Sequence, residues 1–150
     1  MSKILRNIGL AVAASVVMTT PIAAQTMVQL QIGNPEIMVD GVVMHIAEPV
    51  IIDGRAVVPL RPVIEALGGS VIWNENLRFI TIRDHVGENE IILQINSHDS
   101  VVNGRTGPRL DVPPMLAGET AKVPISFVSA HLGFAIEWNE QQQTITITGK

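Results

Sequence analysis

The chain contains no cysteine and no tyrosine among its 150 residues, and five aromatic side chains in all, two Trp and three Phe. Without cysteine there is no disulfide framework, no thiol nucleophile, no thiolate metal site and no N-terminal cysteine to carry a lipid. Without tyrosine there is no phenolic acid or nucleophile, and no cofactor made by oxidising a tyrosine in place. The absences therefore exclude several enzyme classes.

Basic side chains are also few, and they start at the N-terminus. Lys3 and Arg6 precede an apolar run that ends before Thr19, and Ala24 closes a small-residue cleavage site, the pattern of a secretory signal peptide. The alternative is an uncleaved anchor, but the run is shorter than the roughly 20 residues of a membrane-spanning helix. Removing residues 1–24 leaves a net charge of −6 and no stable membrane span, and this acidity argues against nucleic acid as a partner.

Catalytic motifs are missing as well. The sequence has no Gly-x-Ser-x-Gly elbow, no phosphate-binding glycine loop and no His-Glu-x-x-His helix. Asp84-His85 and His98-Asp99 are the only acid–histidine neighbours, and both fall in polar stretches where solvated loops are expected. We therefore expect no catalytic residue, no metal site and no cofactor, although distant histidines could converge on a metal. The four histidines are His45, His85, His98 and His131.

An internal repeat is present at a shift of 65 residues. Between residues 49–82 and 114–147, 13 of 34 positions are identical. Self-similarity of this kind predicts two copies of one small unit. We expect a signal peptide (1–24), an N-terminal linker (25–35), a first unit (36–97) and a second unit (98–150), with one shared core or two. The structural signature consists of Pro59, Leu67, Gly68, Trp73, Pro124, Leu132, Gly133 and Trp138.

Turn signals divide each copy into short strands. Asp40-Gly41, Asp53-Gly54 and Asn103-Gly104 each lie between apolar stretches and tolerate positive φ at a hairpin turn. A later hairpin turns at residues 74–77, with Val71 and Trp73 on one face, and residues 91–95 supply a strand that joins the copies. Antiparallel hairpins are therefore expected throughout.

One short helix is expected per copy. Leu60, Val63, Ile64 and Leu67 recur at helical spacing before Gly68, and in the second copy Ser126 would cap a helix that ends at Gly133. Helices of two turns need tertiary packing to be stable. The fold class is α+β: two tandem pseudo-repeats in which antiparallel β-sheet hairpins wrap around short α-helices.

A family resemblance follows from the string IDGRAVVPLR at residues 52–61, continued by EALGG at 65–69 and VIWN at 71–74. Over residues 36–148 the chain resembles the N-terminal stalk domain of copper amine oxidases, a module that recurs in secreted bacterial proteins. The resemblance implies a five-stranded antiparallel sheet twisted around a helix, a cell-surface setting and no catalysis by the module. The oxidase reaction itself needs a tyrosine-derived quinone, which this chain cannot form, and a copper held by three histidines.

The second copy keeps the core pattern but departs in its polar residues. Glu119-Thr120 replaces Gly54-Arg55, and Ser126 replaces Arg61. Arg61 and Glu65 lie four residues apart on the expected helix, where a surface ion pair is favoured over an anion site. Trp73 and Trp138 would serve as sugar-stacking platforms if exposed, but their aliphatic neighbours favour burial.

The functional prediction is a non-catalytic exported module, not an enzyme, that binds peptidoglycan, a wall polymer or a surface protein. The alternative is an assembly module that self-associates or pairs through strand edges. A hydrolase has no supporting motif. Candidate ligand-binding residues are Arg55, Arg61 and Arg105, and the expected location is secreted or cell-envelope associated.

Overall fold

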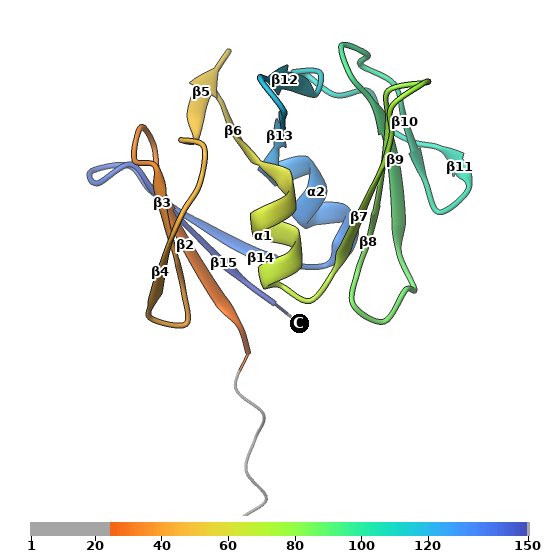
Figure 1. Ribbon diagram of the computed structural model, residues 1–150. Coiled ribbons are helices and arrows are strands. Elements are labelled where there is room, and N and C mark those ends of the chain that lie inside the picture. Colours follow the sequence, from red (N-terminus) through yellow and green to blue (C-terminus); the bar gives the residue numbers. More distant parts are fainter. Residues whose placement is uncertain (1–24, 150) are drawn as a thin grey trace, which may run out of the picture.

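The computed structural model describes residues 25–149, so the expected signal peptide at 1–24 lies outside the described residues. The described part forms antiparallel sheets and two short helices (Figure 1). The strands are β2 (Met27–Gln31), β3 (Glu36–Val39), β4 (Val42–His45), β5 (Val50–Ile52), β6 (Arg55–Pro59), β7 (Ser70–Asn74), β8 (Phe79–Arg83), β9 (Glu90–Gln94), β10 (Ser100–Val102), β11 (Arg105–Thr106), β12 (Met115–Ala117), β13 (Thr120–Pro124), β14 (Ala135–Asn139) and β15 (Thr144–Thr148). The helices are α1 (Leu60–Ala66) and α2 (Ile125–Leu132). This arrangement agrees with the predicted α+β class.

The strands are divided among three sheets. The terminal sheet has the order β14-β15-β2-β3-β4, the internal sheet β11-β10-β9-β8-β7, and the bridging sheet β12-β13-β6-β5. Both helices lie between the two five-stranded sheets (Figure 1). Within residues 25–149 no helix is long and apolar enough to cross a membrane.

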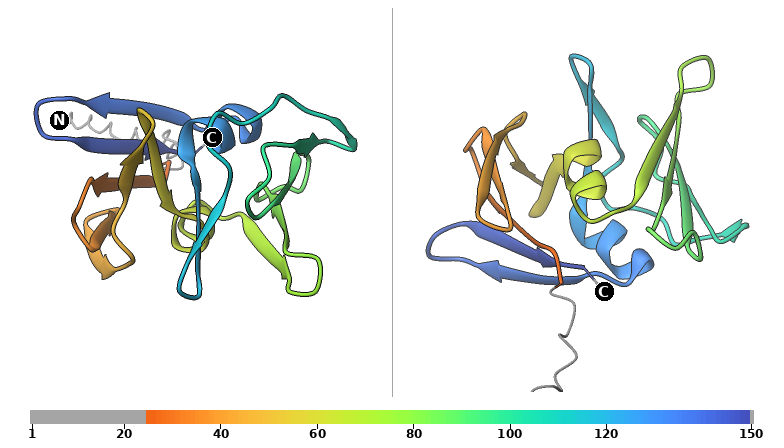
Figure 2. Two further views of the ribbon diagram at one scale, coloured as in Figure 1. Left: turned by 90° about the horizontal axis from the view of Figure 1, so that it is seen from above. Right: turned by 60° about the horizontal axis from the view of Figure 1, so that its bottom comes forward.

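The terminal sheet joins the two ends of the described chain. Strand β2 lies beside β15 (Figure 2) and pairs with it along its whole length, with Gln29 opposite Thr146. The expected linker at 25–35 is therefore wrong: Val28 and Leu30 are buried on the core face of a strand. The alternation of apolar and polar residues that is typical of a strand is present in this part of the sequence. The partner strand β15, however, lies more than a hundred residues further along the chain.

Equivalent elements begin 65 residues apart, yet the sheets do not follow the sequence units. Strands β6 and β13, helices α1 and α2, and hairpins β7–β8 and β14–β15 keep this spacing. The first hairpin joins the strands that follow it, whereas the second joins strands from the beginning of the chain. The boundary expected between residues 97 and 98 consequently falls inside the internal sheet.

The hydrophobic core is one cluster that draws on both halves of the chain. Leu60 and Ile64 of α1 and Val128 and Leu132 of α2 are fully buried in it, together with alternate residues of the outer sheets. Burial of each large aliphatic side chain is worth about 1.5–3 kcal/mol. Packing against a shared core therefore stabilises helices that are too short to persist alone.

The helix ends and turns follow the predicted residue types, with one exception. Helix α1 ends in a Schellman motif, in which the N–H of Gly69 bonds the carbonyl of Ile64 (2.9 Å) and Gly68 takes φ +86°. Gly133 likewise takes φ +79° after α2, as expected. Ser126 is not the N-cap, because α2 begins at Ile125 directly after the extended Pro124, with no side-chain cap.

The three predicted hairpin turns are confirmed by their backbone angles. The first residues of the turn pairs, Asp40, Asp53 and Asn103, have φ between +49° and +52°, and the glycine that follows each is also positive. Positive φ at both positions matches the type I′ turn, whose twist suits two-residue hairpins. The strands on either side are consequently held in the registers observed.

Candidate ligand clefts

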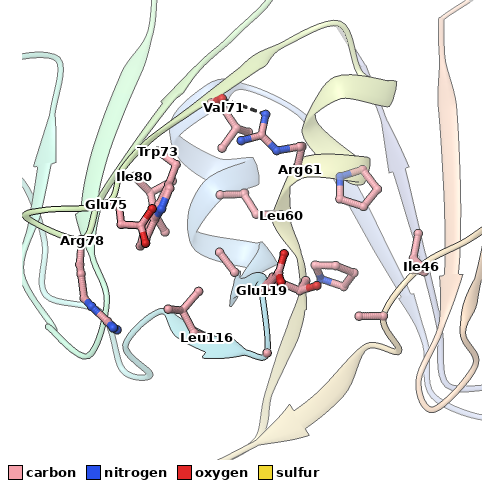
Figure 3. Close-up of a pocket in the computed structure, with 16 residues that line it drawn as sticks. Ile46, Leu60, Arg61, Val71, Trp73, Glu75, Arg78, Ile80, Leu116 and Glu119 are labelled. Atoms are coloured by element: carbon pink, nitrogen blue, oxygen red, sulfur yellow. Dashed lines mark hydrogen bonds between the residues drawn. The ribbon is translucent and has the colours of Figure 1, made fainter.

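The larger cleft lies between strand β7, the start of α1 and the β12–β13 hairpin. Its volume is about 790 Å³, and we call it the first cleft (Figure 3). It is lined by Ile46, Ala47, Pro59, Leu60, Arg61, Pro62, Val71, Trp73, Glu75, Arg78, Ile80, Leu116, Gly118, Glu119, Thr120 and Ala121. Segments far apart in the sequence therefore meet around one hollow.

The first cleft combines an apolar wall with charged groups. Leu60 and Ile80 are fully buried beneath it, and Trp73 is half-buried against the core. Arg78 and Glu75 join the lining from the hairpin that follows Trp73. Trp73 thus packs against the core as predicted while also lining an accessible cleft, so both interpretations of this residue apply in part.

Arg61 has two contacts at the rim of this cleft. Its Nη1 lies 3.0 Å from Glu65 Oε2, the expected ion pair, and 3.2 Å from the backbone carbonyl oxygen of Val71. Both side chains of the pair are about half exposed, so water screens the attraction and it contributes little to stability. The pair does orient the guanidinium over the edge of β7.

A second, smaller cleft of about 330 Å³ lies beside β14. It is lined by Ile51, Gly54, Arg55, Ala56, Ile125, Ser126, Ile136, Trp138, Glu140, Gln143 and Ile145. Each of these residues is 65 positions from a residue that lines the first cleft. The two clefts are therefore built from matching positions, but their charged groups differ.

Trp138 does not have the burial that was predicted for it. It is 45% exposed on β14, whose five residues are all exposed. Its counterpart Trp73 is better covered, although β7 is also an edge strand, because Trp73 packs against the hydrophobic core. The repeat preserved the residue, and the tertiary surroundings decided its exposure.

The three candidate arginines are not brought together. Arg61 lines the first cleft and Arg55 the second, where its Nη2 is paired with Asp111 Oδ2. Arg105 is exposed on the two-residue edge strand β11 and lines neither cleft. Sequence reasoning missed Arg78 and Glu119, because their counterparts at the 65-residue shift, Gln143 and Gly54, carry no charge.

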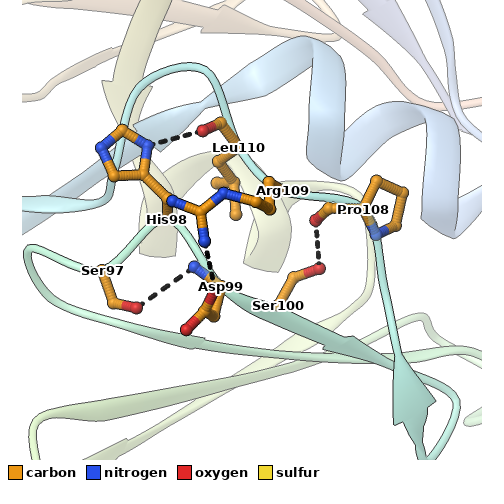
Figure 4. A network of polar contacts seen from close by, with 7 residues as sticks. All are labelled: Ser97, His98, Asp99, Ser100, Pro108, Arg109 and Leu110. Carbon is orange, nitrogen blue, oxygen red and sulfur yellow. Dashed lines mark hydrogen bonds and ion pairs between the residues drawn. The ribbon is translucent and has the colours of Figure 1, made fainter.

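One of the two acid–histidine neighbours, His98-Asp99, makes contacts that hold two loop segments together. The Nδ1 of His98 lies 2.7 Å from the carbonyl oxygen of Leu110, and Arg109 Nη1 is 2.8 Å from Asp99 Oδ1 (Figure 4). Ser100 Oγ also donates to the carbonyl of Pro108 at 2.7 Å. These bonds hold the loop before β10 against the segment after β11, and the His98 and Asp99 side chains bond different partners.

Asp84 departs from the solvated loop that was expected, because it is only 4% exposed. Burial raises the pKa of this carboxyl, but hydrogen bonds from the Asn89 side chain and from the backbone N–H groups of Asn89, Glu88 and Gly87 outweigh burial and lower the pKa. The bonds from Asn89 Nδ2 and Glu88 N are both 2.9 Å long. Asp84 therefore organises the β8–β9 turn as a carboxylate.

Metal-ligating side chains do not cluster in the part of the chain that the structure describes. No group of three or more His, Asp and Glu residues is placed to hold a metal ion within residues 25–149. His131 instead contacts Phe127, with its Nδ1 2.9 Å from the Phe127 carbonyl oxygen. Among the surface clefts of the described residues, the first and second are the two lined by positions related through the 65-residue shift.

Comparison with known proteins gives one match. No curated protein and no solved structure matches the chain. The family model for the copper amine oxidase N-terminal domain matches residues 38–147, which span both clefts. That family is a non-catalytic domain of copper amine oxidases. Because the match covers most of the chain, the protein belongs to the copper amine oxidase N-terminal domain family.

Proposed function

We propose that this protein is an exported, non-catalytic module that binds a polymer of the cell envelope in the first cleft. The observation that carries the proposal is the cleft itself, about 790 Å³ in volume and lined by Trp73 with charged groups on several sides. Ligand sites commonly measure about 300–1,000 Å³ and combine apolar walls with a few polar groups. The signal-like N-terminal segment supports export.

The residues of the first cleft fit a wall polysaccharide. A pyranose has an apolar face that stacks on an indole, and Trp73 offers such a surface. Arg61 and Arg78 supply donors for acidic or hydroxyl groups, while Glu75 and Glu119 accept hydrogen bonds from sugar hydroxyls. A sugar chain carrying carboxylate or phosphate groups would use both kinds of contact.

The test uses the chain from Gln25 onward with purified envelope material. The protein should co-sediment, and Arg61→Ala and Arg78→Ala should each reduce the retained fraction several-fold, because each removes a donor from the cleft. Arg105→Ala is the matched control, since it removes the same charge at β11 and should leave retention unchanged.

A second measurement assigns binding to the cleft. In Trp138→Phe the remaining tryptophan is Trp73, so soluble wall fragments should change its fluorescence in a saturable way. Retention that is equal for all three alanine variants, together with unchanged Trp73 fluorescence, would refute the proposed site.

The alternative function is assembly through strand edges, and the edge strand β4 favours it. All four of its residues are exposed, and Val42 is 62% exposed with Val43 and Met44 beside it. An unpaired apolar edge is a template for pairing with another chain. Light scattering over a range of concentrations tests this: an assembly module forms oligomers that Val43→Lys weakens, whereas a wall-binding module stays monomeric.

A further inference from the structure

The two clefts differ at the strand edge that forms one wall of each. In the first, the Arg61 guanidinium donates to the Val71 carbonyl and lies over the edge of β7 (Figure 3). In the second, Ser126 occupies the position equivalent to Arg61, and it makes no hydrogen bond to β14 within residues 25–149. The carbonyl of Ile136 on β14, which is equivalent to that of Val71, therefore has no such bond from an arginine.

The edge strand β14 is as long as any strand in the part of the chain that the structure describes. Strand β14 has five residues, all exposed, and it pairs on one side with β15 while no described strand lies on its other side. In an antiparallel edge strand, alternate residues direct their N–H and C=O groups away from the sheet. An extended peptide can satisfy these groups by adding a strand, which is β-augmentation.

The side chains of β14 offer a reason for such a peptide to bind here. Ile136 and Trp138 both line the second cleft and lie opposite Ile147 and Ile145 of β15. A strand added beside β14 would direct every second side chain toward the same face. Alternate apolar residues of the peptide would then cover Ile136 and Trp138, which are exposed in the free protein.

The charged side chains around β14 indicate what kind of peptide would bind there. Glu137 lies on the opposite face of β14 and Glu140 lies at the rim of the cleft, and neither has an ion pair within residues 25–149. The cation that lines this cleft, Arg55, is already paired with Asp111. The local charge left without a partner is therefore negative, which favours basic side chains in the peptide.

We propose that β14 and the second cleft form an acceptor site for an extended peptide segment in which apolar and basic residues alternate. The segment binds by strand addition, with its apolar side chains on Ile136 and Trp138 and its basic side chains toward Glu137. This site is separate from the first cleft and does not depend on the function proposed there.

The experiment uses a blocked decapeptide of alternating valine and lysine as the probe. In Trp73→Phe the remaining tryptophan is Trp138, and its fluorescence should change saturably with peptide. In Trp138→Phe the same peptide should leave Trp73 nearly unchanged. A copy of the peptide methylated at alternate backbone nitrogens, which cannot pair as a strand, should bind at least ten-fold more weakly, as should a copy with glutamate for lysine.

Two substitutions of Ser126, the residue equivalent to Arg61, distinguish the effect of blocking the strand edge from the effect of adding a positive charge. Ser126→Arg copies the arginine that covers β7 and should weaken peptide binding more than Ser126→Lys, which adds the same charge without the forked donors. Circular dichroism checks that both variants are folded. Equal binding of the methylated and unmethylated peptides, or an equal response of Trp73, would overturn the proposal.

Discussion

Gly69 is the single residue that allows the chain to pass directly from helix α1 into strand β7. Its N–H closes the Schellman motif of α1, and the next residue begins β7. A Cβ atom built at this position would lie 2.5 Å from the carbonyl oxygen of Arg83 and 2.8 Å from Cγ2 of Ile64. Glycine is needed here because the backbone passes too close to its neighbours for any side chain.

We therefore expect Gly69→Ala to lower the free energy of unfolding by roughly 1–3 kcal/mol, the usual cost of overpacking. Gly149→Ala is the matched control, because its Cβ would be in ordinary contact, 3.7 Å from Leu67 Cδ2. Urea unfolding measures both variants. An equal effect of the two substitutions would contradict the steric account.

Asp84 gives the expected dependence of stability on pH. Its pKa is lowered in the folded state, so the stability it contributes is present above the unfolded pKa of about 3.9 and is lost as pH falls through the folded value. Asp84→Asn should therefore be less stable than the parent chain at pH 7, with a smaller difference at pH 3. Urea midpoints at the two pH values test this, and a difference that does not change with pH would rule it out.

At the scale of elements, the edges of the sheets carry most of the functional argument. Arg61 bonds one carbonyl at the edge of β7, β11 has only two residues, and all residues of the edge strands β14 and β4 are exposed. Short or covered edges limit unwanted pairing, whereas open ones invite a partner. One difference between β7 and β14 is that Ser126 stands at the position equivalent to Arg61.

Strand β2 provides a test of how the terminal sheet is held together. Deleting residues 25–31 removes the strand between β15 and β3 and exposes Ile37 and Ile145, which are buried. We expect the shortened chain to lose its cooperative unfolding transition, because the sheet is split and the core opened. A flexible linker could be removed without this effect, and unchanged thermal unfolding would disprove the structural role.

On the scale of the whole molecule, the core connects what the sequence presents as two units. The cluster includes Leu30 and Ile145 of the terminal sheet, Ile80 and Leu93 of the internal sheet, and residues of both helices. Because the sheets exchange hairpins across the sequence units, neither unit encloses its own core. Folding of the halves should therefore be coupled.

This coupling predicts that Trp73 and Trp138 report one unfolding transition. The variants Trp138→Phe and Trp73→Phe each leave one tryptophan to follow in urea, and each curve is corrected for the stability change caused by its substitution. The dependence of the unfolding free energy on urea concentration should then have the same slope in both, since this slope scales with the surface exposed on unfolding. Curves of clearly different slope, or a curve with two steps in either variant, would indicate that the halves unfold separately.

Much of the local structure was determined by the sequence itself. Asp-Gly and Asn-Gly pairs set the hairpin turns, Gly68 and Gly133 ended the helices, and the α+β class followed from their order. These predictions succeeded because they depend on φ preferences and on side-chain periods that act over a few residues. The family resemblance rested on the same short strings and was confirmed.

Only the tertiary structure decided which segments meet. It paired β2 with β15, buried Asp84, left Trp138 exposed, and gathered residues from α1, β7 and the β12–β13 hairpin around the first cleft. The repeat had indicated equivalent residues but not their exposure, because burial depends on neighbours that are distant in sequence. The duplicated pattern thus determined the elements, while long-range packing determined the clefts and the open edge beside them.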